Sequence, residues 1–224
     1  MKLHYDPLST TSRAVTFFLY DQAIAFDEAV VSLHQGDQRR PEFLALNPNG
    51  QVPVLEDGDF VLTESAAILR HVARRTGSAA WPEDVRGQAR VDEALSWFES
   101  GLNTYFCKFS VYPRMLPELL ALPEGSRADL QRLGAQGTQR YLDVLDRTWL
   151  AKAPFVCGEA ITLADYFGAA ILTLGFVIDF DFSAWPNVAA WLERLKRRPG
   201  WDPAFASFCG FLIASRREMA EAGA

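Results

Sequence analysis

Hydrophobic and polar residues alternate in two different ways along the chain, and the change between them falls near residue 77. Before it, short apolar runs with strand spacing are interleaved with stretches of helical spacing. The element order βαβαββα predicts a small thioredoxin-like α/β domain whose first three elements form a βαβ unit. The expected elements are strands at 2–5 and 26–31, helices at 12–21 and 41–44, a hairpin of 54–56 with 60–62, and a helix at 64–76 that Gly77 ends.

Strand signals disappear in the second part of the chain. Residues 78–84 have the composition of a linker, so we expect one domain at 1–77 and another at 85–224. Apolar residues recur at helical spacing over 85–109 and again over 128–150. This pattern predicts an all-α C-terminal helical domain.

Thr162-Leu-Ala-Asp165 precedes a strongly apolar stretch of that domain. In such a capping box, each of the two side chains satisfies a backbone N–H at the start of a helix. A buried helix start needs this arrangement because water cannot reach it. We therefore assign both residues to folding.

The composition narrows the class of protein. With 49% hydrophobic residues among 224, the chain can bury a substantial core. Its formal net charge is −6 and it has no basic stripe, so nucleic acid is not an expected partner. The N-terminus lacks the apolar region of a signal peptide, and no run reaches the roughly 18 apolar residues of a membrane span. We expect a cytoplasmic protein with no membrane partner.

The three cysteines, Cys107, Cys157 and Cys209, lie far apart, and no C-x-x-C motif occurs. This pattern indicates neither a disulfide framework nor a zinc site, and it fits a reducing cytosol. The three histidines also lack metal-ligand spacing. We expect no bound metal, and cysteines that fill core space or line a pocket.

The segment from Asn47 to Leu69 carries the most informative motif. Val52-Pro53 stands where a strand should begin, a position at which proline is tolerated. A cis bond there would turn the backbone N–H and C=O of the preceding residue outward, where an extended peptide can pair with them. Glu64 and Ser65 then open a helix, whose free N–H groups bind a carboxylate. These features indicate a site for a small anionic peptide.

This segment, NPNGQVPVLEDGDFVLTESAAIL, resembles the glutathione-binding half of the cytosolic glutathione transferases. Thr162-x-x-Asp165 resembles a motif in the helical domain of the same family, so the resemblance extends past the first domain. It implies glutathione as co-substrate. Gln38 and Gln51 would hold the glycyl carboxylate. Val52 and Pro53 would hold the cysteinyl unit, and Glu64 and Ser65 would hold the γ-glutamyl end.

Hydroxyl groups cluster between the first strand and the first helix. A hydroxyl that donates a hydrogen bond to a thiolate lowers the thiol pKa from about 8.5, and a helix N-terminus acts in the same direction. Asp6-Pro-Leu-Ser-Thr-Thr-Ser-Arg13 resembles the serine-type transferases (theta, delta and related bacterial classes), and Ser9 matches their catalytic serine. A proline often follows two residues later, where this chain has Thr11. The cluster alone is also typical of a polar turn and helix cap. The alternative thiolate donors are Thr10, Ser12 and Tyr5.

The resemblance implies a homodimeric detoxification enzyme in which glutathione thiolate attacks a small hydrophobic electrophile. Two alternatives stay open: a non-catalytic transferase-like binding or regulatory module, and a specialised glutathione-dependent dehalogenase, lyase or peroxidase. An aromatic-rich wall facing Ser9 suits a planar hydrophobic substrate. The residues expected to line it are Leu8, Tyr105, Phe109, Tyr112, Phe208 and Phe211.

Overall fold

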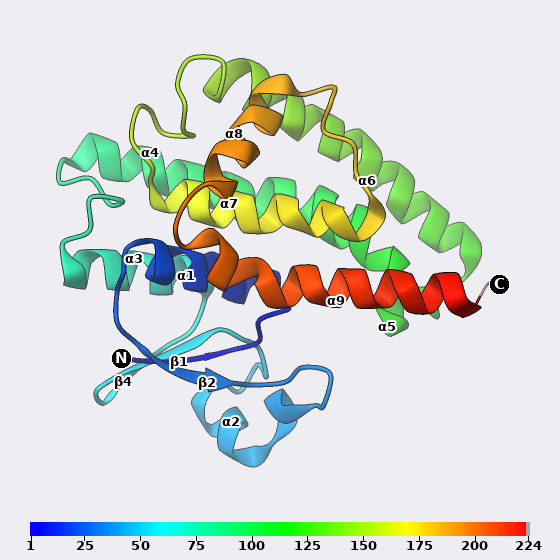
Figure 1. Ribbon diagram of the computed structural model, residues 1–224, viewed down its shortest axis with the longest axis horizontal. Helices are drawn as coiled ribbons and strands as arrows, with labels where there is room; N and C mark the ends of the chain where they lie inside the picture. The colour runs from blue at the N-terminus through cyan, green and yellow to red at the C-terminus, as the bar shows by residue number, and fades with distance from the viewer. Residues whose placement is uncertain (223–224) are drawn as a thin grey trace. The chain divides into compact units, whose positions relative to one another are not determined.

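The structure is a computed structural model that describes residues 1–222 (Figure 1). Its contacts divide the chain into two compact units. The first unit holds residues 1–78 together with the stretch from Lys196 onward, which includes the C-terminal helix, and the second holds residues 79–195.

A four-stranded mixed sheet forms the centre of the first unit. Its strand order is β2-β1-β3-β4, which the sequence pattern could not give. β1 pairs parallel with β2, as a βαβ crossover requires, and the other two pairings are antiparallel. The strands are β1 Lys2–Tyr5, β2 Asp27–Val30, β3 Val54–Asp57 and β4 Phe60–Leu62.

Helices cover both faces of this sheet (Figure 1). α1 and α3 lie against one face, and α2 lies on the other, where Phe43 packs with Val52 and Val54. The expected α/β fold with the order βαβαββα is confirmed, with boundaries that differ from the predicted ones by at most two residues. The helical elements are α1 Thr10–Asp21, the 3₁₀ turn Asp37–Arg39, α2 Pro41–Leu46 and α3 Ser65–Thr76, which Gly77 ends in the left-handed conformation.

The last helix, α9 Trp201–Ala222, packs on α1 and belongs by its contacts to the first unit. The predicted domain division places this helix with the others of the C-terminal domain. α1 is buried on nearly all sides, so it needs a cover beyond the sheet and α3. Phe17 meets the rings of Trp201 and Phe205 at 5.4 and 5.5 Å between ring centres.

The second unit is entirely helical apart from one isolated β-bridge in the described part of the chain, as expected. Its central helix α7, yellow in Figure 1, is buried along its whole length. The elements are α4 Val85–Ser96, its wide-turned continuation Trp97–Val111, a 3₁₀ turn Tyr112–Arg114, α5 Pro117–Leu120, α6 Glu124–Val144 with a wide turn Leu145–Trp149, α7 Leu163–Thr173, a 3₁₀ turn Leu174–Ile178 and α8 Pro186–Lys196.

Asp165 completes the predicted capping box at the start of α7. Its carboxylate accepts hydrogen bonds from the backbone N–H of Thr162 at 2.8 Å and from the Thr162 hydroxyl at 3.1 Å. The backbone N–H of Val156 and the indole N–H of Trp191 also donate to it, each at 2.9 Å. Burial raises the pKa of Asp165, and these donors offset part of the rise. The carboxylate therefore joins a loop and two helices at one buried point.

No helix within residues 1–222 is both long enough and apolar enough to cross a membrane.

Candidate active site

The loop between β1 and α1 is held in one shape by Asp6. The buried Asp6 carboxylate accepts hydrogen bonds from the backbone N–H of Leu8 at 2.7 Å and of Leu33 at 2.8 Å. The Ser9 N–H donates to the Asp6 carbonyl at 3.0 Å. Ser9 then caps α1, because its Oγ accepts from the backbone N–H of Ser12 at 3.4 Å. The cap fixes the Ser9 hydroxyl at the positive end of the helix.

Burial separates the candidate hydroxyls of this loop. The side chains of Ser9 and Thr11 are half-buried and reachable from solvent. Thr10 is only 7% exposed, and Ser12 is 0% exposed with its Oγ accepting from the Asp6 N–H. A ligand can therefore reach Ser9 and Thr11 more readily than the other two.

The phenol of Tyr5 is directed toward the neighbouring strand. Its hydroxyl donates to Glu28 at 2.5 Å, and the Tyr20 hydroxyl donates to the other carboxylate oxygen at 2.7 Å. Burial, and secondarily the hydrogen bond to Glu28, raises the pKa of Tyr5. The same causes raise the pKa of Tyr20 to about 12. Because the Tyr5 proton is committed to Glu28, this geometry does not favour Tyr5 as a thiolate donor.

The buried Arg13 side chain holds the loop between β1 and α1 in place. It is 0% exposed, and its Nη1 donates to the Leu8 carbonyl at 2.7 Å. Its guanidinium lies 3.6 Å from the centre of the Phe208 ring of α9, within the range of a cation–π contact. The residue directly before Ser9 is thus tied to the C-terminal helix of the same unit.

The loop before β3 carries the second part of the site. The Val52–Pro53 peptide bond is cis, and Val52 is 8% exposed. Asn47 holds the loop, since its Nδ2 donates to the Gln51 carbonyl at 2.7 Å and its Oδ1 accepts from the Asn49 N–H at 3.1 Å. The sequence analysis placed Asn47 in the motif without assigning it this structural role.

The start of α3 carries the third part. Glu64 has φ +67° and ψ 112°, a conformation that non-glycine residues rarely adopt. Such strain persists only where the surroundings enforce it, and it is concentrated at functional sites. The exposed Glu64 is followed by the buried Ser65, where the free N–H groups of the helix begin.

These three parts meet at a small cavity of about 60 Å³ within the first unit. It has room for a polar head group, and it combines a carboxylate, a helix N-terminus and a strand entrance. Thr11 was not among the predicted site residues, and its place opposite the Val-Pro bond had no signal in the sequence. The lining residues are Thr11, Asn47, Gln51, Val52, Pro53, Glu64 and Ser65.

Two of the residues predicted to contact glutathione or its thiol, Ser9 and Gln38, do not line this cavity. Ser9 reaches it through Thr11, with 3.2 Å between the two hydroxyl oxygens. Gln38 is not a lining residue: its Nε2 lies 3.5 Å from the Leu33 carbonyl, and its Oε1 is buried without a hydrogen-bond partner. Its backbone carbonyl lies close to Gly50, the neighbour of Gln51.

The residues expected at the electrophile are divided between the two units. In the first unit, the Leu8 carbonyl accepts a hydrogen bond from Arg13. Phe208 is 3% exposed and packs against the Arg13 guanidinium, whereas Phe211 is 46% exposed. In the second unit, Tyr105 and Phe109 form an edge-to-face ring pair with 5.9 Å between centres, and Tyr112 is half-buried.

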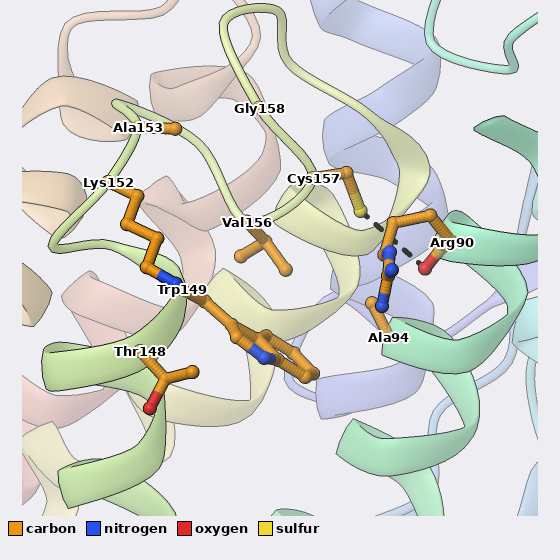
Figure 2. Close-up of a pocket in the computed structure, with 9 residues that line it drawn as sticks. All are labelled: Arg90, Ala94, Thr148, Trp149, Lys152, Ala153, Val156, Cys157 and Gly158. Atoms are coloured by element: carbon orange, nitrogen blue, oxygen red, sulfur yellow. Dashed lines mark hydrogen bonds between the residues drawn. The ribbon is translucent and has the colours of Figure 1, made fainter.

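A separate cavity of about 340 Å³ lies within the second unit (Figure 2). Cys157 lies on its wall, and its Sγ donates to the Arg90 carbonyl at 3.8 Å. Burial raises the pKa of the Cys157 thiol to about 11, which disfavours the nucleophilic thiolate form. The described residues contain no cluster of three or more histidine, cysteine or acidic side chains that could hold a metal ion. The lining residues are Arg90, Ala94, Thr148, Trp149, Lys152, Ala153, Val156, Cys157 and Gly158.

Comparison with known proteins covers both units. Residues 5–74 match the glutathione S-transferase N-terminal domain family, and residues 114–199 match the C-terminal domain family. The chain is 33% identical to glutathione S-transferase theta-1 of Bos taurus, over 89% of this chain and 84% of the relative. It is 30% identical to glutathione S-transferase theta-2 of Homo sapiens, over 88% and 80% of the two chains.

Solved structures agree. The crystal structure of human glutathione transferase theta-2 in complex with glutathione matches with a TM-score of 0.85 at 27% identity, covering 97% of this chain and 90% of that one. A glutathione S-transferase from Pseudomonas fluorescens matches with a TM-score of 0.77 at 28% identity, covering 89% and 96%. The resemblance to serine-type, theta-like transferases is confirmed. The chain belongs to the glutathione S-transferase family.

Proposed function

We propose that the protein is a glutathione transferase in which the Ser9 hydroxyl stabilises the thiolate of bound glutathione for attack on a small hydrophobic electrophile. The observation that carries this proposal is the cavity that joins the start of α3, the Val52–Pro53 strand entrance and Thr11, with Ser9 in contact with Thr11. A tripeptide with two carboxylates, one ammonium and one thiol fits this set of groups.

The γ-glutamyl end of the tripeptide lies at the start of α3 in this proposal. Its α-carboxylate accepts hydrogen bonds from the first N–H groups of the helix and from the Ser65 hydroxyl, where the helix dipole favours negative charge. Its α-ammonium pairs with Glu64. Gln51 donates to the glycyl carboxylate, and Gln38 stays a further candidate for the same group.

The cysteinyl unit pairs with the backbone of Val52, as an added strand does at a sheet edge. This places the sulfur toward the N-terminus of α1. A hydrogen bond from Ser9 and the positive end of α1 both stabilise the charged form, so the thiol pKa falls below its ordinary value of about 8.5. The thiolate then forms a carbon–sulfur bond by addition or by displacing a leaving group, without a general base.

Glu64→Ala is expected to weaken glutathione binding by roughly 10-fold or more, because the ammonium loses a charged hydrogen-bond partner. The value of kcat at saturating glutathione should fall much less. Isothermal titration calorimetry gives the affinity, and steady-state kinetics gives kcat. Glu64→Gln keeps the length of the side chain without its charge and should bind with intermediate affinity. Glu159→Ala, at an exposed position, is the matched control. Affinity equal to that of the wild type in Glu64→Ala would place the ligand elsewhere.

The proposal is distinguished from a non-catalytic binding module by one titration. Glutathione is added to the purified protein across a range of pH while the ultraviolet absorbance of the thiolate is recorded, and a chloronitrobenzene then reports turnover. A thiolate band that appears at a pH below the pKa of the free thiol, together with turnover, supports an enzyme. Glutathione binding without a thiolate band and without turnover supports a binding module. Substrate screening tests dehalogenase, lyase and peroxidase chemistry as alternatives to conjugation at the same glutathione site.

We also propose a homodimer formed through β4 and α3. β4 is an edge strand, and its Phe60 and Val61 side chains are 47% and 39% exposed. An exposed apolar edge strand pairs readily with another chain unless it is covered. Beside it, α3 contributes a shallow cavity lined by Arg70 and Arg74 together with His71 and Arg75, both of which pair with Asp57.

Light scattering after size exclusion is expected to give twice the mass of the single chain. Phe60→Asp should raise the dimer dissociation constant by roughly 10-fold or more, because it places a charge on the exposed apolar edge strand. Val85→Asp changes an equally apolar side chain that is 79% exposed elsewhere, and should leave the mass unchanged. A monomeric wild type, or a Phe60→Asp variant that stays fully dimeric, would exclude this interface.

Cytoplasmic location is part of the proposal. Cys107, Cys157 and Cys209 form no disulfide with one another in the structure, which fits a reducing compartment.

A further inference from the structure

Three groups at the site form a chain of hydrogen bonds with a defined direction. The Thr11 hydroxyl donates to the Val52 carbonyl at 3.1 Å, and 3.2 Å separates its oxygen from Ser9 Oγ. A hydroxyl has one hydrogen, and a carbonyl can only accept. Thr11 therefore donates its one hydrogen to the Val52 carbonyl, so Ser9 must donate the hydrogen bond between Ser9 and Thr11. In the absence of ligand, the Ser9 hydrogen points along this chain.

This direction conflicts with the proposed role of Ser9, which needs its hydrogen for the sulfur of glutathione. The Val52 carbonyl, at the end of the chain, is also the group with which the cysteinyl unit is proposed to pair. A carbonyl oxygen has two lone pairs, so an incoming peptide N–H either joins the Thr11 hydroxyl there or displaces it. Where it displaces the hydroxyl, peptide binding and the direction of the Ser9 hydroxyl are coupled through Thr11.

We propose that Thr11 is a positioning residue that redirects Ser9 when glutathione binds. The peptide N–H takes the place of the Thr11 hydroxyl on the Val52 carbonyl. Thr11 then donates to Ser9 Oγ, and Ser9 donates to the thiolate. No covalent bond changes; two hydroxyl hydrogens rotate. This inference rests on the proposed function, and it gives the tripeptide backbone a part in activating its own thiol.

The reversed chain strengthens the bond to sulfur. A hydroxyl that accepts one hydrogen bond becomes a better donor of another, because aligned hydrogen bonds polarise one another. The backbone N–H of Ser12, which donates to Ser9 Oγ at 3.4 Å, acts in the same sense. Removing the Thr11 hydroxyl should raise the pKa of the bound thiol by a few tenths of a unit, less than the roughly 0.5–1 unit expected for losing one neutral hydrogen bond to the sulfur itself.

The test is the pKa of glutathione bound to the full-length protein, measured from thiolate absorbance against pH. Thr11→Val keeps the shape and loses the hydroxyl, and Thr11→Ser keeps the hydroxyl. We expect a raised thiol pKa in the first, a value near that of the wild type in the second, and glutathione affinity at acidic pH unchanged within about 2-fold in both. Thr16→Val is the matched control, because the Thr16 hydroxyl bonds only the backbone of its own helix, at 3.4 Å.

A double variant separates positioning through Ser9 from every other role. In a Ser9→Ala background, Thr11→Val should cause no further shift, because the group that it redirects is gone. An unchanged thiol pKa in Thr11→Val, or an equal shift in both backgrounds, would overturn the inference while Ser9 keeps its role. A Ser9→Ala variant with the thiol pKa of the wild type would instead overturn the role that the proposed function gives to Ser9. Thr11→Ala repeats the measurement with a second variant that lacks the hydroxyl.

Discussion

Ser9→Ala is expected to lower kcat for conjugation by roughly 10²-fold, the usual cost of losing one donor that stabilises a developing or resident anion in an active site. The Ser9 hydroxyl lies at the N-terminus of α1 and contacts Thr11, which lines the proposed glutathione cavity. Without it the thiol pKa should rise toward its ordinary value of about 8.5, so less thiolate is present at neutral pH. The glutathione affinity should change by less than about 3-fold, because the contacts to both ends of the peptide remain.

The measurement is the pH dependence of kcat together with the absorbance of bound thiolate. In Ser9→Ala the rise of kcat with pH should move to higher pH. The kcat values of the wild type and the variant should converge at a pH where the thiol of glutathione is ionised without the Ser9 hydroxyl. Ser9 also caps α1, so the variant should lose about 1 kcal/mol of stability, which a thermal melt detects. Assays well below the melting temperature keep the two effects apart.

The alternative hydroxyls are tested in the same assay. Ser12→Ala and Thr10→Val remove groups that are 0% and 7% exposed, and neither should shift the thiol pKa. Tyr5→Phe should leave it unchanged as well, because that phenol donates to Glu28. A wild-type pH profile in Ser9→Ala, combined with a loss in one of these three variants, would transfer the role to that residue.

Asp165→Ala is expected to lower the free energy of unfolding by roughly 3–5 kcal/mol, the largest stability effect that we predict. Four hydrogen-bond donors, from Val156, Thr162 and Trp191, lose the one acceptor that they share in a fully buried place. Each buried donor without a partner costs about 1–3 kcal/mol, and water can relieve only part of this. Urea denaturation followed by tryptophan fluorescence gives the value, since Trp191 lies in the affected cluster.

Two variants calibrate that result. Asp165→Asn keeps the volume and one acceptor oxygen, but it turns an NH₂ group toward donors. We therefore expect an intermediate loss of unfolding free energy. Asp181→Asn changes an exposed carboxylate that bonds only Ser183, and its unfolding curve should coincide with that of the wild type. If Asp165→Ala unfolded at the same urea concentration as the wild type, the capping box would not hold the helical unit together.

The catalytic consequence of Asp165→Ala should be indirect. No residue of the capping box lines the glutathione cavity, which lies in the other unit. The thiol pKa of bound glutathione should therefore stay at the wild-type value wherever the variant is folded. This outcome would separate the folding motif at Thr162–Asp165 from the site motif at 47–69.

The sequence by itself determined most of the local structure and the family. Gly77 ends α3 because only glycine adopts its left-handed conformation, with φ +63°, at little cost. Thr162 and Asp165 cap α7 because the two side chains and the N–H groups that they satisfy lie within three residues of each other. The Val-Pro and Glu-Ser pairs predicted two halves of a peptide site for the same reason: each depends on backbone geometry that a few neighbouring residues set.

Only the tertiary structure decided which of these groups meet. Thr11 and Val52 lie 41 positions apart, and their hydrogen bond depends on the pairing of β1 with β3, which no local pattern specifies. Burial of Ser12 and exposure of Ser9 likewise depend on how the loop folds under Asp6 and Arg13. The docking of α9 on α1 joins residues nearly two hundred positions apart, through apolar rings that suit many partners equally well. Local interactions are encoded by spacing, whereas contacts between distant segments arise only when burial of the whole core selects one arrangement.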